Sequence, residues 1–191
     1  MTLENWVRIL KSGRKFYKLA DFIKLSGLPY RSCRVSLARL VKKGLLIKLG
    51  KEFFGSTLVP FSTEEAICQS YLPSYLSYEY ALSHHGVLDQ MPYVYTAATS
   101  RRSKKTKIGN MEVVYKHLRK TLFWGYVPEG EACIAEPEKA LLDWLYLRRH
   151  EKSGLNLDEI HWEEMDIPKL KSYSKRFPKE VRKKIEPFCQ G

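Results

Sequence analysis

Residues 28–44 read LPYRSCRVSLARLVKKG, and this stretch decides how the first part of the chain is expected to fold. Apolar residues recur along it at helical spacing and predict one buried stripe, made of Cys33, Leu37, Leu40 and Val41. At about 100° per residue, the opposite side of the same helix carries Arg31, Val35, Arg39 and Lys42. Pro29 is tolerated where the helix begins, and Gly44 ends it.

Two shorter helices are expected before this stretch. Leu3, Trp6, Val7 and Leu10 follow the i, i+3, i+4, i+7 spacing of an amphipathic helix. After a short extended piece at residues 16–18, a second helix is expected over residues 19–26, with Gly27 as its C-terminal cap.

A β-hairpin is expected directly after the third helix, with strands at residues 45–49 and 52–55 and a tight turn at residues 50–51. Three short helices and a hairpin within sixty residues are typical of a winged-helix domain. Its second and third helices form a helix-turn-helix, and the third helix lies in the major groove of DNA. We therefore expect a winged-helix DNA-binding domain over residues 1–60.

The distribution of charge favours the same interpretation. The whole chain has a net charge of +12, and residues 1–60 alone carry 13 lysines and arginines against three acidic residues. Positive charge concentrated in residues 1–60 favours binding to a polyanion, because each phosphate that is neutralised releases counterions. A surface rich in lysine and glutamate, as in thermophiles, would explain many of these charges but not their imbalance along the chain.

Nine residues are the candidate contacts to double-stranded DNA: Tyr30, Arg31, Ser32, Arg34, Val35, Arg39, Lys42, Lys48 and Lys51. The planar fork of an arginine bonds O6 and N7 of guanine together, so Arg31 and Arg34 suit base recognition. Lys48 and Lys51 on the hairpin suit the backbone, where contacts add affinity but little sequence information. The alternatives are a winged helix that binds protein, and a basic face that is merely solvated.

Residues 61–191 predict a mixed α/β domain, which makes the chain α+β as a whole. Ser62 or Thr63 caps a first short helix. Further helices are expected over residues 75–85, from Pro137, from Pro168 and from Pro178, so that about the last 40 residues are helical. Short strands are expected at residues 93–99, 111–115, 122–124 and 132–134. A basic loop between the first two strands is a second candidate basic patch, formed by Arg101, Arg102, Lys104, Lys105 and Lys107.

The sequence contains no common catalytic or metal-binding motif. The sequence has no G-x-x-x-x-G-K-[ST] loop, no G-x-S-x-G elbow and no H-E-x-x-H motif, and its four cysteines form no C-x-x-C pair. We therefore expect no enzyme, cofactor or metal. The nearest approach to a catalytic cluster is Glu136, Glu138, Lys139 and Asp143, where a nuclease would hold a metal. The simpler interpretation is that Glu136 and Glu138 favour the positive end of the helix that Pro137 begins.

The N-terminal sequence does not resemble a signal peptide, and no apolar run in the sequence is long enough to span a membrane. A cytoplasmic location without membrane contact is therefore expected.

Three segments together resemble the AbiEi-type antitoxins of type IV toxin–antitoxin systems. They are YLSYEYALSHHGV at residues 75–87, TAATSRR at residues 96–102 and AEPEKALLD at residues 135–143. The resemblance covers about residues 5–147, and Val87 stands where the family commonly has leucine. It implies a repressor that binds promoter repeats of its own operon and a second domain that counters a nucleotidyltransferase toxin. A homodimer is also expected.

Two other functions stay open at this point. One is a winged-helix transcription factor whose second domain forms a dimer or senses a ligand. A nuclease using Glu136, Glu138 and Lys139 is the more remote alternative.

Overall fold

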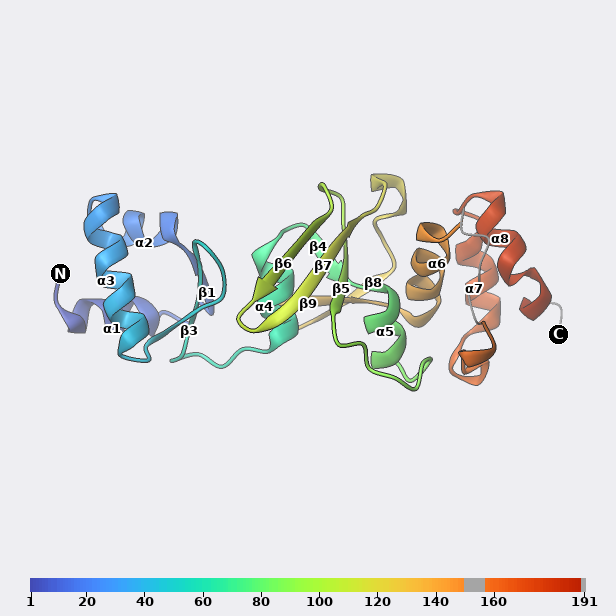
Figure 1. Cartoon of the computed structure of the whole chain (residues 1–191), viewed down its shortest axis with the longest axis horizontal. Coiled ribbons are helices and arrows are strands. Elements are labelled where there is room, and N and C mark those ends of the chain that lie inside the picture. Colours follow the sequence, from blue (N-terminus) through green and yellow to red (C-terminus); the bar gives the residue numbers. More distant parts are fainter. Residues whose placement is uncertain (150–156, 190–191) are drawn as a thin grey trace.

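The computed structural model describes residues 1–149 and 157–189 and has a mixed α+β fold (Figure 1). The α-helices in these ranges are α1 Leu3–Leu10, α2 Leu19–Ser26, α3 Tyr30–Lys42, α4 Thr63–Ser70, α5 Tyr78–His84, α6 Pro137–Leu147, α7 Ile167–Ser174 and α8 Lys179–Ile185. The strands are β1 Phe16–Lys18, β2 Leu46–Lys48, β3 Phe53–Ser56, β4 Ser74–Leu76, β5 Tyr95–Thr99, β6 Lys104–Ile108, β7 Met111–His117, β8 Tyr126–Glu129 and β9 Ala132–Ala135.

The first part of the chain packs three helices against a small antiparallel sheet. Its strand order is β1-β3-β2, so the hairpin β2–β3 is joined by the extended piece that precedes α2. One face of this sheet and the three helices enclose a separate apolar core, formed by Trp6, Leu10, Tyr17, Leu19, Phe22, Cys33, Leu37, Leu40, Leu46 and Phe54. Stacking of Tyr17 on Phe22, with ring centroids 4.8 Å apart, fixes α2 to β1.

The other face of the small sheet packs against the rest of the molecule. Phe16, Leu49 and Phe53 belong to the larger core, and Phe16 lies edge-on to Phe61 with centroids 4.9 Å apart. The amide of Gly109 also donates a hydrogen bond of 3.3 Å to the carbonyl of Leu49. The turn between β6 and β7 therefore contacts the hairpin directly. A domain boundary near residue 60 stays a prediction.

The second sheet has six strands in the order β6-β7-β5-β4-β9-β8. The pairs β5–β7 and β4–β9 are parallel and the others antiparallel. Helix α4 covers one face, where the hydroxyl of Tyr115 donates to the carbonyl of Ile67 at 2.8 Å. Helix α6 lies on the opposite face, where the hydroxyl of Tyr75 donates to Asp143 at 2.8 Å.

Helices α7 and α8 pack on α6 through buried Leu170, Phe177, Val181 and Ile185, at the end of the molecule opposite to α1, α2 and α3 (Figure 1). None of the helices in the described ranges is both long and apolar enough to cross a membrane.

The α+β class is confirmed, and several local expectations are corrected. Residues 75–76 belong to strand β4 rather than to a helix, and α5 begins at Tyr78. Most of the expected basic loop is strand β6. Residues 122–124 form no strand, since a 3-10 turn ends at Leu122 and β8 begins at Tyr126. Helices α7 and α8 match the helices expected from Pro168 and Pro178, but residues 157–166 form only 3-10 turns and irregular structure. Residues 150–156 and 190–191 of the expected helical end lie outside the described residues.

Candidate nucleic-acid interface

Helix α3 is held in place by its apolar stripe and by the turn before it. Gly27 ends α2 in the left-handed conformation, with φ of 67°, which glycine adopts without strain. Pro29 caps α3, and Cys33, Leu37 and Leu40 are buried against α1, α2 and the small sheet. The rest of the helix surface is left to solvent.

The outward side of α3 combines cations with exposed apolar groups. Arg31, Arg39 and Lys42 are exposed, and α3 contains no acidic residue. Val35 is 51% exposed and Tyr30 is 49% exposed on the same helix. Apolar groups among cations fit the major groove, where a thymine methyl group lies beside hydrogen-bonding base edges.

A cavity of about 250 Å³ lies between α3 and the β2–β3 hairpin. Its cations are Arg34 from α3, Lys48 from β2 and Lys51 from the turn. The remaining lining side chains are small or apolar, namely Leu19, Leu37, Ala38, Val41 and Phe54. Three cations from two elements therefore surround one hollow, which suits the negatively charged groove of a duplex.

The hairpin turn is tied to the start of α3. The hydroxyl of Tyr30 donates a hydrogen bond of 3.3 Å to Glu52, and the guanidinium carbon of Arg34 lies 5.7 Å from the centre of the Tyr30 ring. Glu52 is the one acidic residue between positions 28 and 60, so it neutralises little of this surface. Neither Glu52 nor Ala38, which lines the cavity, is among the predicted contact residues.

All nine predicted contact residues are exposed, but they do not form one cluster. Arg34, Lys48 and Lys51 line the cavity, whereas helical geometry directs Arg31, Val35 and Lys42 outward. Ser32 and Arg39 lie on the flank of α3 farther from the hairpin. The helical spacing in the sequence is sufficient to predict exposure, but the cavity depends on where the hairpin folds back.

The second basic patch lies on the edge strand β6 and the turn before it, and its cations have partners. Arg101 and Lys104 lie over the ring of Tyr71, at 4.2 and 5.1 Å from its centre. Lys105 and Lys107 lie 3.5 and 3.9 Å from the carboxylate of Glu112. Arg102 is exposed. The hydrogen bond from Gly109 to Leu49 joins the far end of this strand to the hairpin of the first sheet.

The residues of the nuclease alternative are not arranged around an open site. Lys139 and Asp143 have no exposed surface and form an ion pair with each other. Burial lowers the pKa of Lys139 and raises that of Asp143. The attraction between the two charges has the opposite effect on each pKa, and burial outweighs it. Glu136 instead binds Lys169 and Tyr173, at 2.9 and 2.7 Å.

Glu138, also buried, accepts a hydrogen bond of 3.0 Å from the amide of Asp166, and its carboxylate lies 3.1 Å from the ammonium of Lys169. The two glutamates therefore fasten α7 to the start of α6. Among the residues that the structure describes, no three histidine, cysteine or acidic side chains are grouped to hold a metal ion.

No protein-family model matches the chain, and no curated protein shows significant sequence similarity to it. A solved structure that it resembles is that of the RV2827C protein from Mycobacterium tuberculosis, with a TM-score of 0.58 and 13% sequence identity. The match covers 96% of this chain and 74% of that one. At this identity the likeness is one of fold alone, and it extends over nearly the whole of the chain.

Proposed function

We propose that the chain is a winged-helix protein that binds double-stranded DNA through helix α3 and the β2–β3 hairpin. The observation that carries the proposal is the cavity shared by Arg34, Lys48 and Lys51, beside a helix face that has no acidic residue. A merely solvated face has no reason to bring cations from two elements together, because like charges repel. A duplex would neutralise all three, with Lys48 and Lys51 at its phosphates and Arg34 nearer its base edges.

In this proposal the first turns of α3 enter the major groove. Arg31 and Arg34 are the residues nearest the base edges, and Val35 meets a thymine methyl group. Lys48 and Lys51 contact phosphates beside the groove and set the orientation of the hairpin. The +10 charge of residues 1–60 raises affinity for any duplex, and the helix supplies the discrimination.

The resemblance to AbiEi-type antitoxins supports a more specific role. We propose a cytoplasmic repressor of its own operon, which binds promoter repeats as a homodimer and counters a co-encoded nucleotidyltransferase toxin. Support comes from three ordered segments of the sequence, at residues 75–87, 96–102 and 135–143. Co-expression with the product of the neighbouring gene tests this role. Growth rescue from a toxic neighbour is expected, and a harmless neighbour, or one that stays toxic, would overturn the antitoxin assignment without touching the DNA-binding one.

Binding to the DNA upstream of the protein's own gene tests the DNA-binding proposal. Fluorescence anisotropy with this duplex and with a shuffled duplex of equal length, each at several salt concentrations, gives affinity, specificity and salt slope. We expect tighter binding to the upstream duplex and a logarithmic slope of about −0.9 for each phosphate neutralised. An affinity that does not change with salt would contradict the electrostatic argument.

A further inference from the structure

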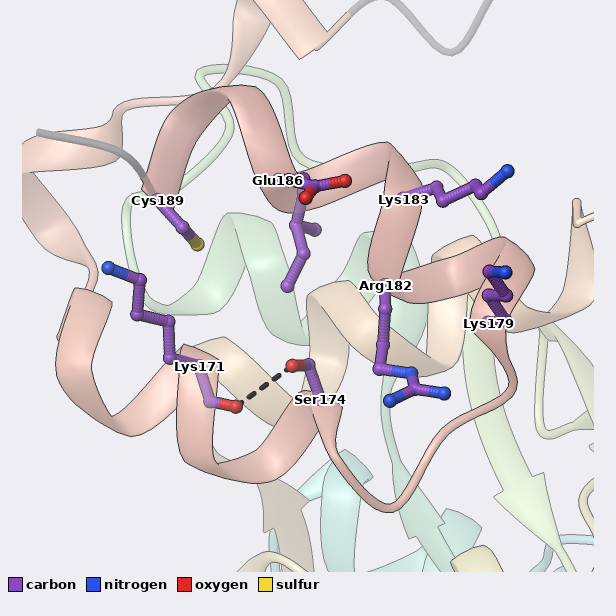
Figure 2. A pocket seen from close by; sticks show the side chains of 8 residues that line it. Lys171, Ser174, Lys179, Arg182, Lys183, Glu186 and Cys189 are labelled. Atoms are coloured by element: carbon purple, nitrogen blue, oxygen red, sulfur yellow. Dashed lines mark hydrogen bonds between the residues drawn. The ribbon is translucent and has the colours of Figure 1, made fainter.

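A second cavity lies at the other end of the molecule, between helices α7 and α8 and the 3-10 turn at Glu186–Cys189. Its volume is about 680 Å³. Figure 2 shows the side chains that line it, which are Lys171, Ser174, Lys179, Arg182, Lys183, Ile185, Glu186 and Cys189. Four of these eight are cations and one is acidic, so the cavity is strongly positive.

The spacing of these residues explains why they meet. Lys179, Arg182 and Lys183 stand at i, i+3 and i+4 on α8 and so share one face of that helix. Lys171 and Ser174 stand at i and i+3 on α7. Buried Ile185, Ser174 and Cys189 form the floor between the two faces, and the cations are exposed at its rim. Cations from two helices therefore lie around one floor, although the Lys183 side chain extends away from it (Figure 2).

Other cations of this segment already have partners. Lys169 pairs with Glu136 at 2.9 Å, Lys184 donates to the carbonyl of Arg148 at 2.8 Å, and Arg176 lies 4.0 Å from the centre of the Trp124 ring. Among the described residues, none of the four cavity cations forms an ion pair, not even with Glu186. Glu186 is the one counter-charge in the lining, so the repulsion among the four cations is only partly offset.

From this arrangement we infer that the cavity between α7 and α8 binds a small ligand that carries two or more phosphate groups. Several phosphates match several cations around one cavity, because charge-assisted hydrogen bonds to lysine and arginine are short and strong. The volume lies in the range of about 300–1,000 Å³ that is usual for small-molecule sites. Ile185 and Cys189 leave an apolar floor for the organic part of such a ligand.

The cavity is distinct from the proposed DNA interface. Helices α7 and α8 lie at one end of the long axis and α3 lies at the other (Figure 1). A duplex held by α3 therefore does not need this site, and the two inferences stand on separate observations. A phosphorylated ligand bound here would act as an effector and not as part of the DNA contact.

Isothermal titration calorimetry of the full chain with ATP and with inorganic tripolyphosphate, without divalent cations, tests the inference. Both probes are expected to bind, and ATP binds more tightly if its base uses the apolar floor. Arg182→Glu is expected to weaken both by about tenfold or more, because it reverses one charge inside the cavity. Lys175→Glu is the matched control: Lys175 is exposed on the same segment but does not line the cavity, so it should change affinity by less than about threefold.

Thermal unfolding of both variants gives a check that they remain folded, and a wild-type melting temperature that rises with ATP supports binding to the folded state. The inference is overturned if neither probe binds the wild type at millimolar concentration in low salt. It is also overturned if Arg182→Glu and Lys175→Glu lose equal affinity, which would indicate a general charge effect. Arg182→Glu should leave binding to the upstream duplex within about threefold, so failure here is separable from failure of the DNA proposal.

Discussion

Arg34 and Lys51 line one cavity, although Arg34 comes from helix α3 and Lys51 from the turn of the β2–β3 hairpin. The hydrogen bond between Tyr30 and Glu52 joins the same two elements. Helix and hairpin therefore both contribute cations to this cavity, and we expect them to bind the same duplex together.

The two basic patches should differ in their effect on DNA affinity, even when the charge removed is the same. Lys48→Ala with Lys51→Ala removes two cations from the cavity, and we expect binding to weaken by about tenfold and the salt slope to become less steep. Lys105→Ala with Lys107→Ala removes two cations that already lie near the carboxylate of Glu112, and we expect DNA binding to weaken by less than about threefold. Anisotropy on the upstream duplex measures both. Equal losses would show that net charge alone governs binding.

Glu65 should stabilise the fold in a pH-dependent way. Burial alone would raise its pKa, but hydrogen bonds from the Glu131 amide, from Lys15 and from Ser62 hold that pKa below its usual value. A carboxyl whose folded pKa is depressed stabilises the protein above its unfolded pKa of about 4.3, and this contribution is lost as the pH falls through the folded pKa.

Glu65→Gln is therefore expected to lower the free energy of unfolding by about 1–3 kcal/mol at neutral pH. The difference from the wild type should shrink below about pH 4. Urea unfolding at pH 7 and at pH 3.5 measures it. A difference that stays constant between the two pH values would mean that the charge of Glu65 is not what stabilises this contact.

The buried ion pair of Lys139 and Asp143 gives a third prediction. Lys139→Met keeps most of the side-chain volume but leaves a fully buried carboxyl without its counter-charge, so we expect a loss of about 3–5 kcal/mol in the free energy of unfolding. The matched control Lys175→Met, at an exposed position, should stay within about 0.5 kcal/mol. Urea unfolding compares them, and similar values for both variants would contradict the assigned role of the pair.

Local patterns were enough to predict much of the secondary structure. Apolar spacing and capping residues predicted α1, α2 and α3, and of the two expected caps of α4 it is Ser62 that accepts the hydrogen bond with its hydroxyl. Pro137 begins α6 as predicted. These features depend on residues close in sequence, so one sequence contains the information that they need.

The errors arose where a strand depends on distant partners. Leu76 pairs in parallel with Ile134, far along the chain, and no local spacing indicates that residues 74–76 form a strand. Residues 104–108 are rich in lysine, which is uncommon in strands, yet they pair with β7 at the edge of the sheet, where lysine is tolerated. In both cases tertiary pairing outweighed local preference.

The candidate sites divide in the same way. Exposure of Arg31, Val35 and Lys42 follows from the helical repeat alone. The cavity between α3 and the hairpin, and the one between α7 and α8, depend on how two elements pack together. The sequence alone does not indicate that Lys171, Lys179, Arg182 and Lys183 line one cavity.

Discrimination between duplexes by Arg34→Ala tests the central claim most directly. Its dissociation constants for the upstream and shuffled duplexes are compared with those of the wild type and of Arg119→Ala, an exposed arginine outside the proposed interface. The account predicts that Arg34→Ala loses about 1–3 kcal/mol on the upstream duplex and less on the shuffled one, so that specificity falls. Arg119→Ala should leave both nearly unchanged. If Arg34→Ala binds both duplexes as the wild type does, helix α3 is not the surface that binds DNA.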